Sequence, residues 1–202
     1  ANPENAKSAM MALLQGGGAQ VSGDEVTNAE WLGDLPKGDA VKIICTTKDQ
    51  PIRPENTLLF HPQRATLGVG CARNCPPAEL ERLVMDVLAA AQIAPKALQG
   101  IYTQDLKADE PAVLHLAAKL NLPLRLFTAT ELEVQTARLE NPSDVVFAEV
   151  GCHGASEGAA LAGGGADATL ASPKTKSEMA TCAIATAPAP ITELAGRARG
   201  KL

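Results

Sequence analysis

The chain has 202 residues, of which 46% are hydrophobic and 20% charged, and these values are typical of a folded chain with one domain or with a small and a larger one. The net charge of -5 and the aromatic content of 2% disfavour nucleic acid as a partner, because phosphate contacts need Lys and Arg and base stacking needs aromatic rings. No apolar run reaches about 18 residues, and Ala1–Asn5 lacks the basic and apolar regions of a signal peptide, so we expect a cytoplasmic chain without a membrane partner.

Residues 1–63 predict a small αβ segment. An apolar stripe predicts a helix at 3–15, and a short acidic helix is expected at 25–32. β-Branched and apolar residues between turn residues give the strand candidates, which are 19–22, 41–45 and 58–60. The strand at 41–45 has the strongest pattern of the three.

Strand and helix patterns alternate over residues 64–186, which indicates a largely parallel sheet. The expected strands are 65–70, 97–103, 122–127, 168–171 and 179–185. The expected helices are 76–92, 111–120, 131–138, 143–150 and 156–161. The fold class is therefore α/β: a three-layer α/β/α domain with a mostly parallel, mixed sheet, preceded by the small αβ segment. Residues 187–202 are interpreted as a linker or tail.

Five cysteines are scattered along the chain, and an odd number without dense spacing does not predict a disulfide framework. Cys71 and Cys75 are separated by three residues, but no second pair and no suitably placed histidine accompanies them. We therefore expect free thiols and no metal site.

Two polar loops follow predicted strands and are expected at the carboxyl edge of the sheet, where ligands of open α/β sheets bind. One loop covers 70–74, and the other covers 104–110. In the second loop, Asp109 is expected to cap the next helix, whereas Asp105 and Lys107 are not explained by capping. A carboxylate held near a lysine can act as a general base toward water, and a solvated turn is the alternative.

Gly68-Val69-Gly70 begins like a dinucleotide-binding fingerprint, but Arg73 stands where the third glycine would be. A nicotinamide or flavin cofactor is therefore not expected. The glycines serve either close packing or the approach of a bulky ligand to the backbone, and the sequence leaves both open.

Other candidate residues lie in the second half of the chain. Lys174 and Lys176 fall in an expected loop between the last two strands and suit a ligand with several carboxylates, although solvated lysines are the alternative. His115 lies between leucines on a predicted helix and is expected to be partly buried. His153, in a turn beside Gly154, is the histidine most expected to face a ligand.

Several segments resemble, in the right order, a known family. Leu67-Gly68-Val69-Gly70-Cys71-Ala72-Arg73 resembles an L-G-[IV]-G-C-R-R signature, and Thr103-Gln104-Asp105-Leu106-Lys107-Ala108-Asp109-Glu110-Pro111 resembles a T-x-D-x-K-x-x-E segment. Asn141-Pro142-Ser143, residues 151–161 and residues 174–185 continue the match. Over residues 64–186 the chain is thereby similar to the C-terminal domain of the CbiG/CobE family of cobalamin biosynthesis, which includes cobalt-precorrin-5A hydrolase. Residues 1–63 resemble the middle region that precedes this domain in the hydrolase. Residues 195–202 resemble the lead-in to a precorrin methyltransferase, as in fusions of the hydrolase with the C17-methyltransferase.

The resemblance implies a protein that binds a corrinoid, or precorrin, intermediate. The family hydrolase opens the ring-A δ-lactone of cobalt-precorrin-5A and releases acetaldehyde, with no cofactor or metal of its own because cobalt belongs to the substrate. Glu110 or Asp105 is then expected to activate the attacking water. The expected substrate-binding residues are Gly68, Gly70, Cys71, Arg73, Thr103, Lys107, Asp109, His153, Gly154, Lys174 and Lys176. A CobE-like carrier without catalysis and a docking partner of a precorrin methyltransferase are the alternatives.

The sequence also departs from the family pattern. Ala72 replaces the first arginine after the cysteine, which puts one ligand contact in doubt. Cys152-His153 stands where the family has small or apolar residues.

Overall fold

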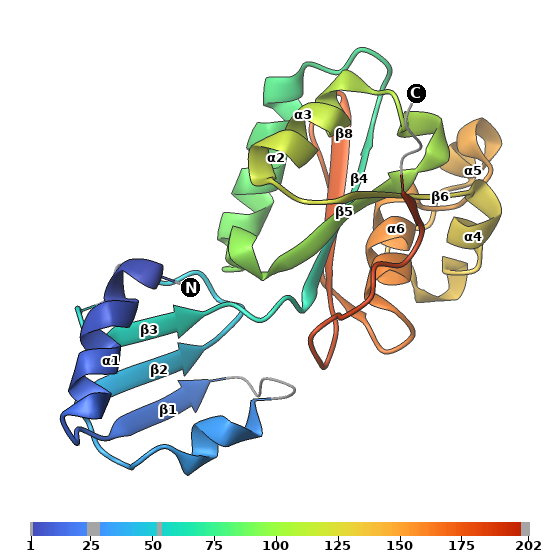
Figure 1. Cartoon of the computed structure of the whole chain (residues 1–202). Coiled ribbons are helices and arrows are strands. Elements are labelled where there is room, and N and C mark those ends of the chain that lie inside the picture. The colour runs from blue at the N-terminus through green and yellow to red at the C-terminus, as the bar shows by residue number, and fades with distance from the viewer. Residues whose placement is uncertain (1, 24–28, 52–53, 199–202) are drawn as a thin grey trace.

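The computed structural model describes residues 2–23, 29–51 and 54–198. Figure 1 shows two units, each built on a β-sheet of its own and joined by a short connection after β3. The smaller unit has a three-stranded sheet, and the larger unit has a six-stranded sheet. The α/β fold expected from the sequence is confirmed.

The described residues of the N-terminal unit form one α-helix and a parallel sheet. Its elements are η1 (Pro3–Asn5), α1 (Ala6–Leu14), β1 (Ala19–Gly23), η2 (Glu30–Asp34), β2 (Val41–Cys45) and β3 (Thr57–Phe60). The strands lie in the order β1-β2-β3, and Ala9 of α1 packs with Val41 and Ile43 in the small core. The three predicted strands are confirmed. The acidic helix expected at 25–32 falls partly outside the described residues, and its described end belongs to the 3-10 helix η2.

Two backbone hydrogen bonds join the units beside the connecting chain. The Asp49 N–H donates to the Gln92 carbonyl over 2.9 Å, and the Ala94 N–H donates to the Thr47 carbonyl over 2.9 Å. Lys48 and Ile93 form an antiparallel bridge between these bonds. The loop after β2 is thereby fixed to the turn that precedes β5.

The larger unit begins with β4 and carries the remaining elements. They are β4 (Ala65–Cys71), α2 (Pro77–Ala90), η3 (Pro95–Ala97), β5 (Leu98–Gln104), η4 (Asp105–Lys107), α3 (Pro111–Leu120), β6 (Leu124–Phe127), α4 (Ala129–Glu133), η5 (Thr136–Arg138), α5 (Asp144–Val150), α6 (Ala155–Gly164), β7 (Thr169–Lys176), β8 (Ala180–Thr186) and β9 (Arg197–Ala198). The strand order is β7-β8-β4-β5-β6-β9. β4, β5 and β6 run parallel, whereas β7, β8 and β9 pair antiparallel with their neighbours.

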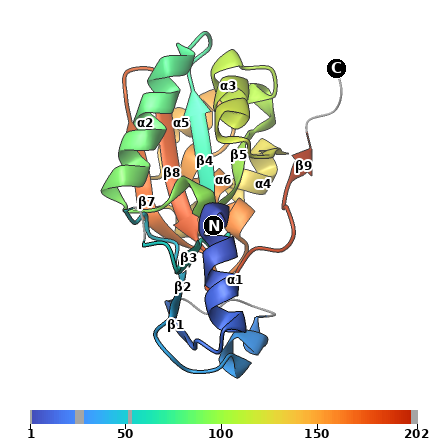
Figure 2. The ribbon, with the colours of Figure 1, turned by 60° about the vertical axis from the view of Figure 1, so that its left-hand side comes forward.

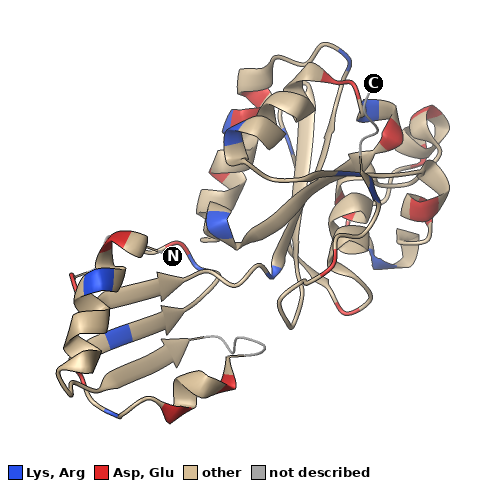
Figure 3. Ribbon diagram, viewed as in Figure 1, with Lys and Arg blue, Asp and Glu red and all other residues tan. Residues whose placement is uncertain are grey.

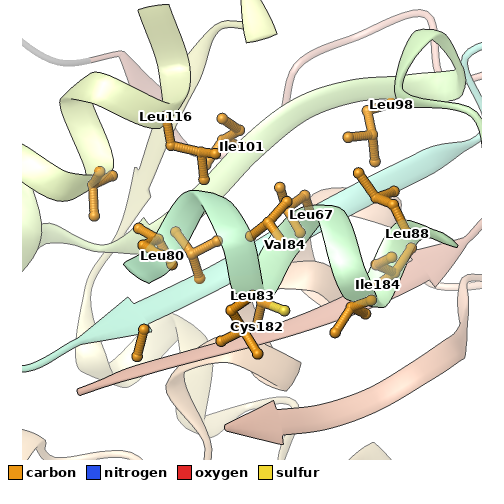
Figure 4. Packing of buried hydrophobic residues seen from close by; sticks show 14 of the residues in the cluster. Leu67, Leu80, Leu83, Val84, Leu88, Leu98, Ile101, Leu116, Cys182 and Ile184 are labelled. Atoms are coloured by element: carbon orange, nitrogen blue, oxygen red, sulfur yellow. The ribbon is translucent and has the colours of Figure 1, made fainter. Parts of the chain in front are cut away.

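Helices cover both faces of this sheet (Figure 2). On one face, α2 and α3 pack on β4, β5 and β8 through aliphatic side chains (Figure 4). The apolar positions predicted for the helix at 76–92 form this contact, and five of them are buried: Leu80, Leu83, Val84, Val87 and Leu88. On the other face, α6 packs on the same strands through small residues such as Ala159 and Ala160. This arrangement is the three-layer architecture expected from the alternating pattern.

Two strands differ from the expectation. β7 extends to Lys176, so Lys174 and Lys176 lie in a strand and the loop assignment is wrong. β7 is an edge strand, and edge strands tolerate exposed lysines and proline. Its lysines and Pro173 therefore give the segment the sequence pattern of a loop. In the expected tail, Arg197–Ala198 pair with β6 as the opposite edge strand.

Candidate functional site

A cavity of about 480 Å³ opens at the carboxyl ends of β4 and β5. The start of β8, the end of β7, one side of α5 and the first residue of α6 complete its wall. Its lining consists of Gly70, Cys71, Ala72, Arg73, Thr103, Gln104, Lys107, Val146, Glu149, Val150, Ala155, Lys176, Ser177, Glu178, Met179, Ala180 and Thr181. The cavity therefore lies where open α/β sheets bind ligands.

The loops after β4 and β5 hold one another in place. Arg73 donates from Nη1 to Asp109 Oδ1 over 2.9 Å and from Nη2 to the Leu106 carbonyl over 2.9 Å. Asn74 adopts a left-handed conformation with φ of 60°, which asparagine tolerates better than most residues. In this conformation its N–H donates to Glu110 Oε1 over 3.1 Å. Both polar loops lie at the carboxyl edge of the sheet, as expected, and they contact one another.

Glu110 lies beneath these loops and outside the cavity lining. Its side chain is 1% exposed, with Oε2 3.5 Å from Arg73 Nη1. This placement suits a residue that fixes the backbone of the loop and does not favour one that activates a water in the cavity. Asp109 is not the helix cap that we expected: Glu110 occupies that position, and no side chain caps α3. The Asp109 carboxylate is instead directed to Arg73.

The floor of the cavity comes from the end of β5. Thr103 donates from Oγ1 to the Val69 carbonyl over 2.8 Å, which joins β5 to β4 through a buried side chain. Gln104 donates from Nε2 to the Val150 carbonyl over 2.7 Å and so attaches the end of α5 to the sheet. The sequence marks the loop at 104–110 as polar, but nothing in it singles out Gln104.

Three cationic side chains line the cavity: Arg73, Lys107 and Lys176. Within the described part of the chain, the ammonium groups of Lys107 and Lys176 have no hydrogen-bond or ion-pair partner. The cavity also has two carboxylates, Glu149 and Glu178. Neither carboxylate could be identified from the sequence, because an exposed glutamate on a short helix or in a turn has no distinctive pattern.

Cys71 lies in the cavity wall and Cys75 is buried behind it. Burial, together with the neighbouring Cys75, raises the pKa of the Cys71 thiol to about 12. Burial also raises the pKa of Cys75. All five cysteines are free, and both members of this pair are neutral thiols at neutral pH.

Other residues expected at the site lie away from the cavity. Lys174 directs Nζ to the Asn141 carbonyl at 3.0 Å, and Asp105 is 3.6 Å from Arg197. Gly154 precedes α6 and packs against Leu139.

Gly68, His115 and His153 do not line the cavity. A Cβ at Gly68 would be 1.9 Å from the Ser156 carbonyl oxygen, so this glycine serves the close packing of β4 against α6. His153 forms a 2.8 Å contact with Glu133. His115 is exposed and lies 2.9 Å from Glu81, so the expectation of a partly buried residue is wrong. His115 lies on the side of α3 that faces α2 and not on the side that faces the core.

Residues 2–23, 29–51 and 54–198 contain no group of three or more His, Cys, Asp or Glu side chains that could hold a metal ion. None of their helices combines the length and apolar character needed to cross a bilayer.

Comparison with known proteins matches residues 65–185 to the family described as Cobalamin synthesis G C-terminus. The chain belongs to this family. Membership confirms the resemblance found in the sequence motifs and assigns the CbiG/CobE-type chain to cobalamin biosynthesis.

Curated relatives fall into two kinds. The chain is 44% identical over 119 residues to Protein CobE from Sinorhizobium sp., a match that covers 59% of the chain and 77% of CobE. It is 34% identical over 141 residues to Cobalt-precorrin-5A hydrolase from Priestia megaterium, which covers 70% of the chain and 37% of the hydrolase. The chain thus spans most of a CobE protein but well under half of that hydrolase.

Solved structures agree with the fold. The crystal structure of CobE, a protein from the cobalamin (vitamin B12) biosynthetic pathway, is 31% identical with a TM-score of 0.56, and the match covers 66% of this CbiG/CobE-type chain and 93% of that one. The structure of a putative cobalamin biosynthesis protein G homolog from Sulfolobus solfataricus has a TM-score of 0.52 at 21% identity, and the match covers 92% of this chain and 56% of that one. The second likeness shows the shared fold.

Proposed function

We propose that the chain binds a corrinoid intermediate of cobalamin biosynthesis in the cavity at the ends of β4 and β5. The observation that carries this proposal is the gathering of Arg73, Lys107 and Lys176 around one cavity in a chain whose net charge is -5. Figure 3 shows basic and acidic residues dispersed over both units, so this local grouping does not follow from the composition. Corrinoid intermediates carry acetate and propionate side chains, whose carboxylates suit such cations.

The size and the wall of the cavity support a site for one edge of the macrocycle. About 480 Å³ lies within the usual range for small-molecule sites. Val146, Val150 and Met179 offer apolar contact beside the cations. We therefore expect the ring to lie against the apolar wall, with its carboxylates directed to Lys107 and Lys176.

Titration with cobyrinic acid, a cobalt corrin with free carboxylate side chains, tests the proposal through the change in its visible spectrum. We expect the affinity to fall about tenfold in Lys107→Ala and in Lys176→Ala, since each variant loses one ion pair in a partly desolvated site. Lys7→Ala is the matched control, because Lys7 is an exposed lysine on α1 in the other unit. The methyl ester of the same corrin controls for the ring and is expected to bind weakly. Equal affinity in all three variants, or equal binding of the ester, would contradict the proposal.

The match to cobalt-precorrin-5A hydrolases supports a second candidate, in which the chain also opens the ring-A lactone and releases acetaldehyde. The placement of Glu110 and the pairing of Asp105 with Arg197 favour binding without catalysis. Incubation with cobalt-precorrin-5A, followed by enzymatic detection of acetaldehyde, distinguishes the two candidates. Binding without acetaldehyde supports a carrier, whereas release that persists in Glu110→Gln assigns the chemistry to other groups. Co-elution with a precorrin methyltransferase without any corrinoid binding would favour the docking alternative.

A further inference from the structure

One wall of the cavity, α5, is only lightly attached to the rest of the unit. None of its seven residues is buried, and only Val146 and Val150 are half-buried. These two residues, with Glu149, are the ones that line the cavity. A helix with so few buried contacts can move at low cost, so the position of this wall depends on polar contacts at its ends.

His153 supplies the contacts at the first turn of α5. Its carbonyl oxygen accepts the N–H of Ser143, the residue before the helix, over 2.9 Å. Its ring stacks on Phe147 with centroids 4.5 Å apart and an interplanar angle of 24°. Ring atom Nε2 lies 3.4 Å from Asp144 Oδ1. His153 therefore contacts the residue before the helix and two residues within it.

The same histidine is anchored to α4 on its other side. Its backbone N–H donates to Glu133 Oε2 over 2.9 Å, and ring atom Nδ1 lies 2.8 Å from Glu133 Oε1. Burial raises the pKa of Glu133, but the hydrogen bonds from His153 outweigh it and leave the pKa below its ordinary value. Glu133 is thus an anion at neutral pH and a fixed acceptor for the ring.

We propose that His153 is a positioning residue that holds α5 as the wall of the corrinoid cavity. The proposal rests on the function proposed above, because it concerns the same cavity. The titratable groups facing the ring are Glu133 from α4 and Asp144 from α5, and the thiol of Cys152 lies beside them. Burial raises the pKa of Cys152 and keeps this thiol neutral.

The ring of His153 lies between two helices and contacts both. Nδ1 is 2.8 Å from Glu133 of α4, and Nε2 is 3.4 Å from Asp144 of α5. The backbone hydrogen bond to Glu133 keeps His153 on α4, and the stacking on Phe147 extends this anchor to α5. Removal of the imidazole therefore takes away the side-chain contacts of His153 that link the first turn of α5 to α4.

The expected consequence of losing these contacts is weaker corrinoid binding, since a wall fixed beforehand lowers the entropy cost of binding. Cobyrinic acid is titrated into the wild-type chain and into His153→Gln and Asp144→Asn. We expect the wild type to bind about threefold more tightly than either variant, a size suited to a partly exposed contact. His115→Gln is the matched control, because His115 also contacts a glutamate, at 2.9 Å, but lies on α3 away from the cavity.

Amide hydrogen exchange at residues 144–150 gives a readout that needs no ligand. Protection of α5 should be lower in both variants than in the wild type, while protection of the other elements of the larger unit stays unchanged. Equal affinity and equal exchange in the wild type and both variants would overturn the positioning role. If no corrinoid binds while the exchange of α5 still depends on His153, the proposed function fails and the positioning role stands. Asp144→Asn keeps the test valid if His153→Gln folds poorly, since Asp144 is fully exposed.

Discussion

The buried carboxylate of Glu157 accepts the backbone N–H of Lys174 over 2.8 Å and thereby ties α6 to the edge strand β7. The same carboxylate accepts the N–H groups of Glu140 and Asn141, over 2.9 and 3.0 Å, and the side-chain amide of Asn141 over 2.8 Å. Three segments that match the family separately in the sequence are therefore joined by one side chain. Glu157 is 1% exposed, and its four hydrogen bonds offset the cost of burying its charge.

Replacement Glu157→Gln should lower the free energy of unfolding by about 2–3 kcal/mol, because the amide leaves part of this donor set unpaired in the interior. Chemical denaturation of the variant beside the wild type measures the change. Glu140→Gln is the control: its side chain is exposed, and only its backbone takes part in the cluster. An equal effect of the two substitutions would show that the buried carboxylate contributes little.

The same carboxylate predicts a dependence of stability on pH. Burial raises the pKa of Glu157, but hydrogen bonds from Lys174, Asn141 and Glu140 outweigh it and bring the pKa below its ordinary value of 4.5. A carboxyl whose pKa is lowered by folding adds stability above its unfolded pKa, and this stability is lost as the pH falls through its folded pKa. We expect the unfolding free energy to decrease below about pH 4.5, and to decrease less in Glu157→Gln. Identical slopes for both proteins in acid denaturation would contradict this assignment.

Gly68→Ala should destabilise the larger unit by about 3 kcal/mol, through overpacking of β4 against α6. A methyl group at this position would lie 1.9 Å from the Ser156 carbonyl oxygen and 2.6 Å from the Ala160 nitrogen, and neither backbone atom can move easily. Gly33→Ala provides the comparison, since a methyl group there meets nothing within 4 Å. Thermal unfolding of both variants should show a lowered midpoint for Gly68→Ala alone.

Elements with hydrophobic periodicity could be predicted from the sequence, and elements without it could not. The helix at α2 repeats apolar residues on one face because that face packs on the sheet, so its spacing identifies it. Strand β7 has exposed and half-buried residues along its whole length, and its Pro173 and lysines resemble a loop. Strand β9 is held in place by Arg125, which donates hydrogen bonds to the carbonyl groups of residues 194–196. These residues are about seventy positions away from Arg125 in the sequence, so no local pattern predicts the contact.

The candidate site could likewise be predicted only in part from the sequence. The order of strands and polar loops places Arg73 and Lys107 at one edge of the sheet, and the structure brings both to the cavity. The burial of Glu110 was not predictable, because it depends on the left-handed turn at Asn74 in a different loop. The contribution of α5 was not predictable either, since its cavity-lining residues become neighbours of β5 only after the chain folds.

Glu110→Gln tests whether the buried carboxylate organises the loop after β4. We expect the unfolding free energy to fall by about 1–2 kcal/mol and the amides of residues 72–75 to exchange faster. Asp109→Asn is the matched substitution in the same loop, and its effect should stay below about 1 kcal/mol because its ion pair with Arg73 is exposed. A larger effect in Asp109→Asn would place the organising contact at the surface instead.

Alkylation of Cys71 offers a direct probe of the cavity, because this thiol is half-exposed in its wall while the other four cysteines are buried. With a pKa of about 12, the thiol is almost fully protonated at neutral pH. Its reaction with iodoacetamide should therefore be slow at neutral pH, and the rate should rise by about tenfold for each pH unit, following the thiolate fraction.

Bound cobyrinic acid should slow the labelling of Cys71, and its methyl ester should not. Mass spectrometry of the intact chain measures both effects, with Cys71→Ser as the control that removes the labelled site. Rapid labelling at neutral pH would contradict the half-buried, neutral thiol, and labelling unaffected by the corrin would place the ligand away from the ends of β4 and β5.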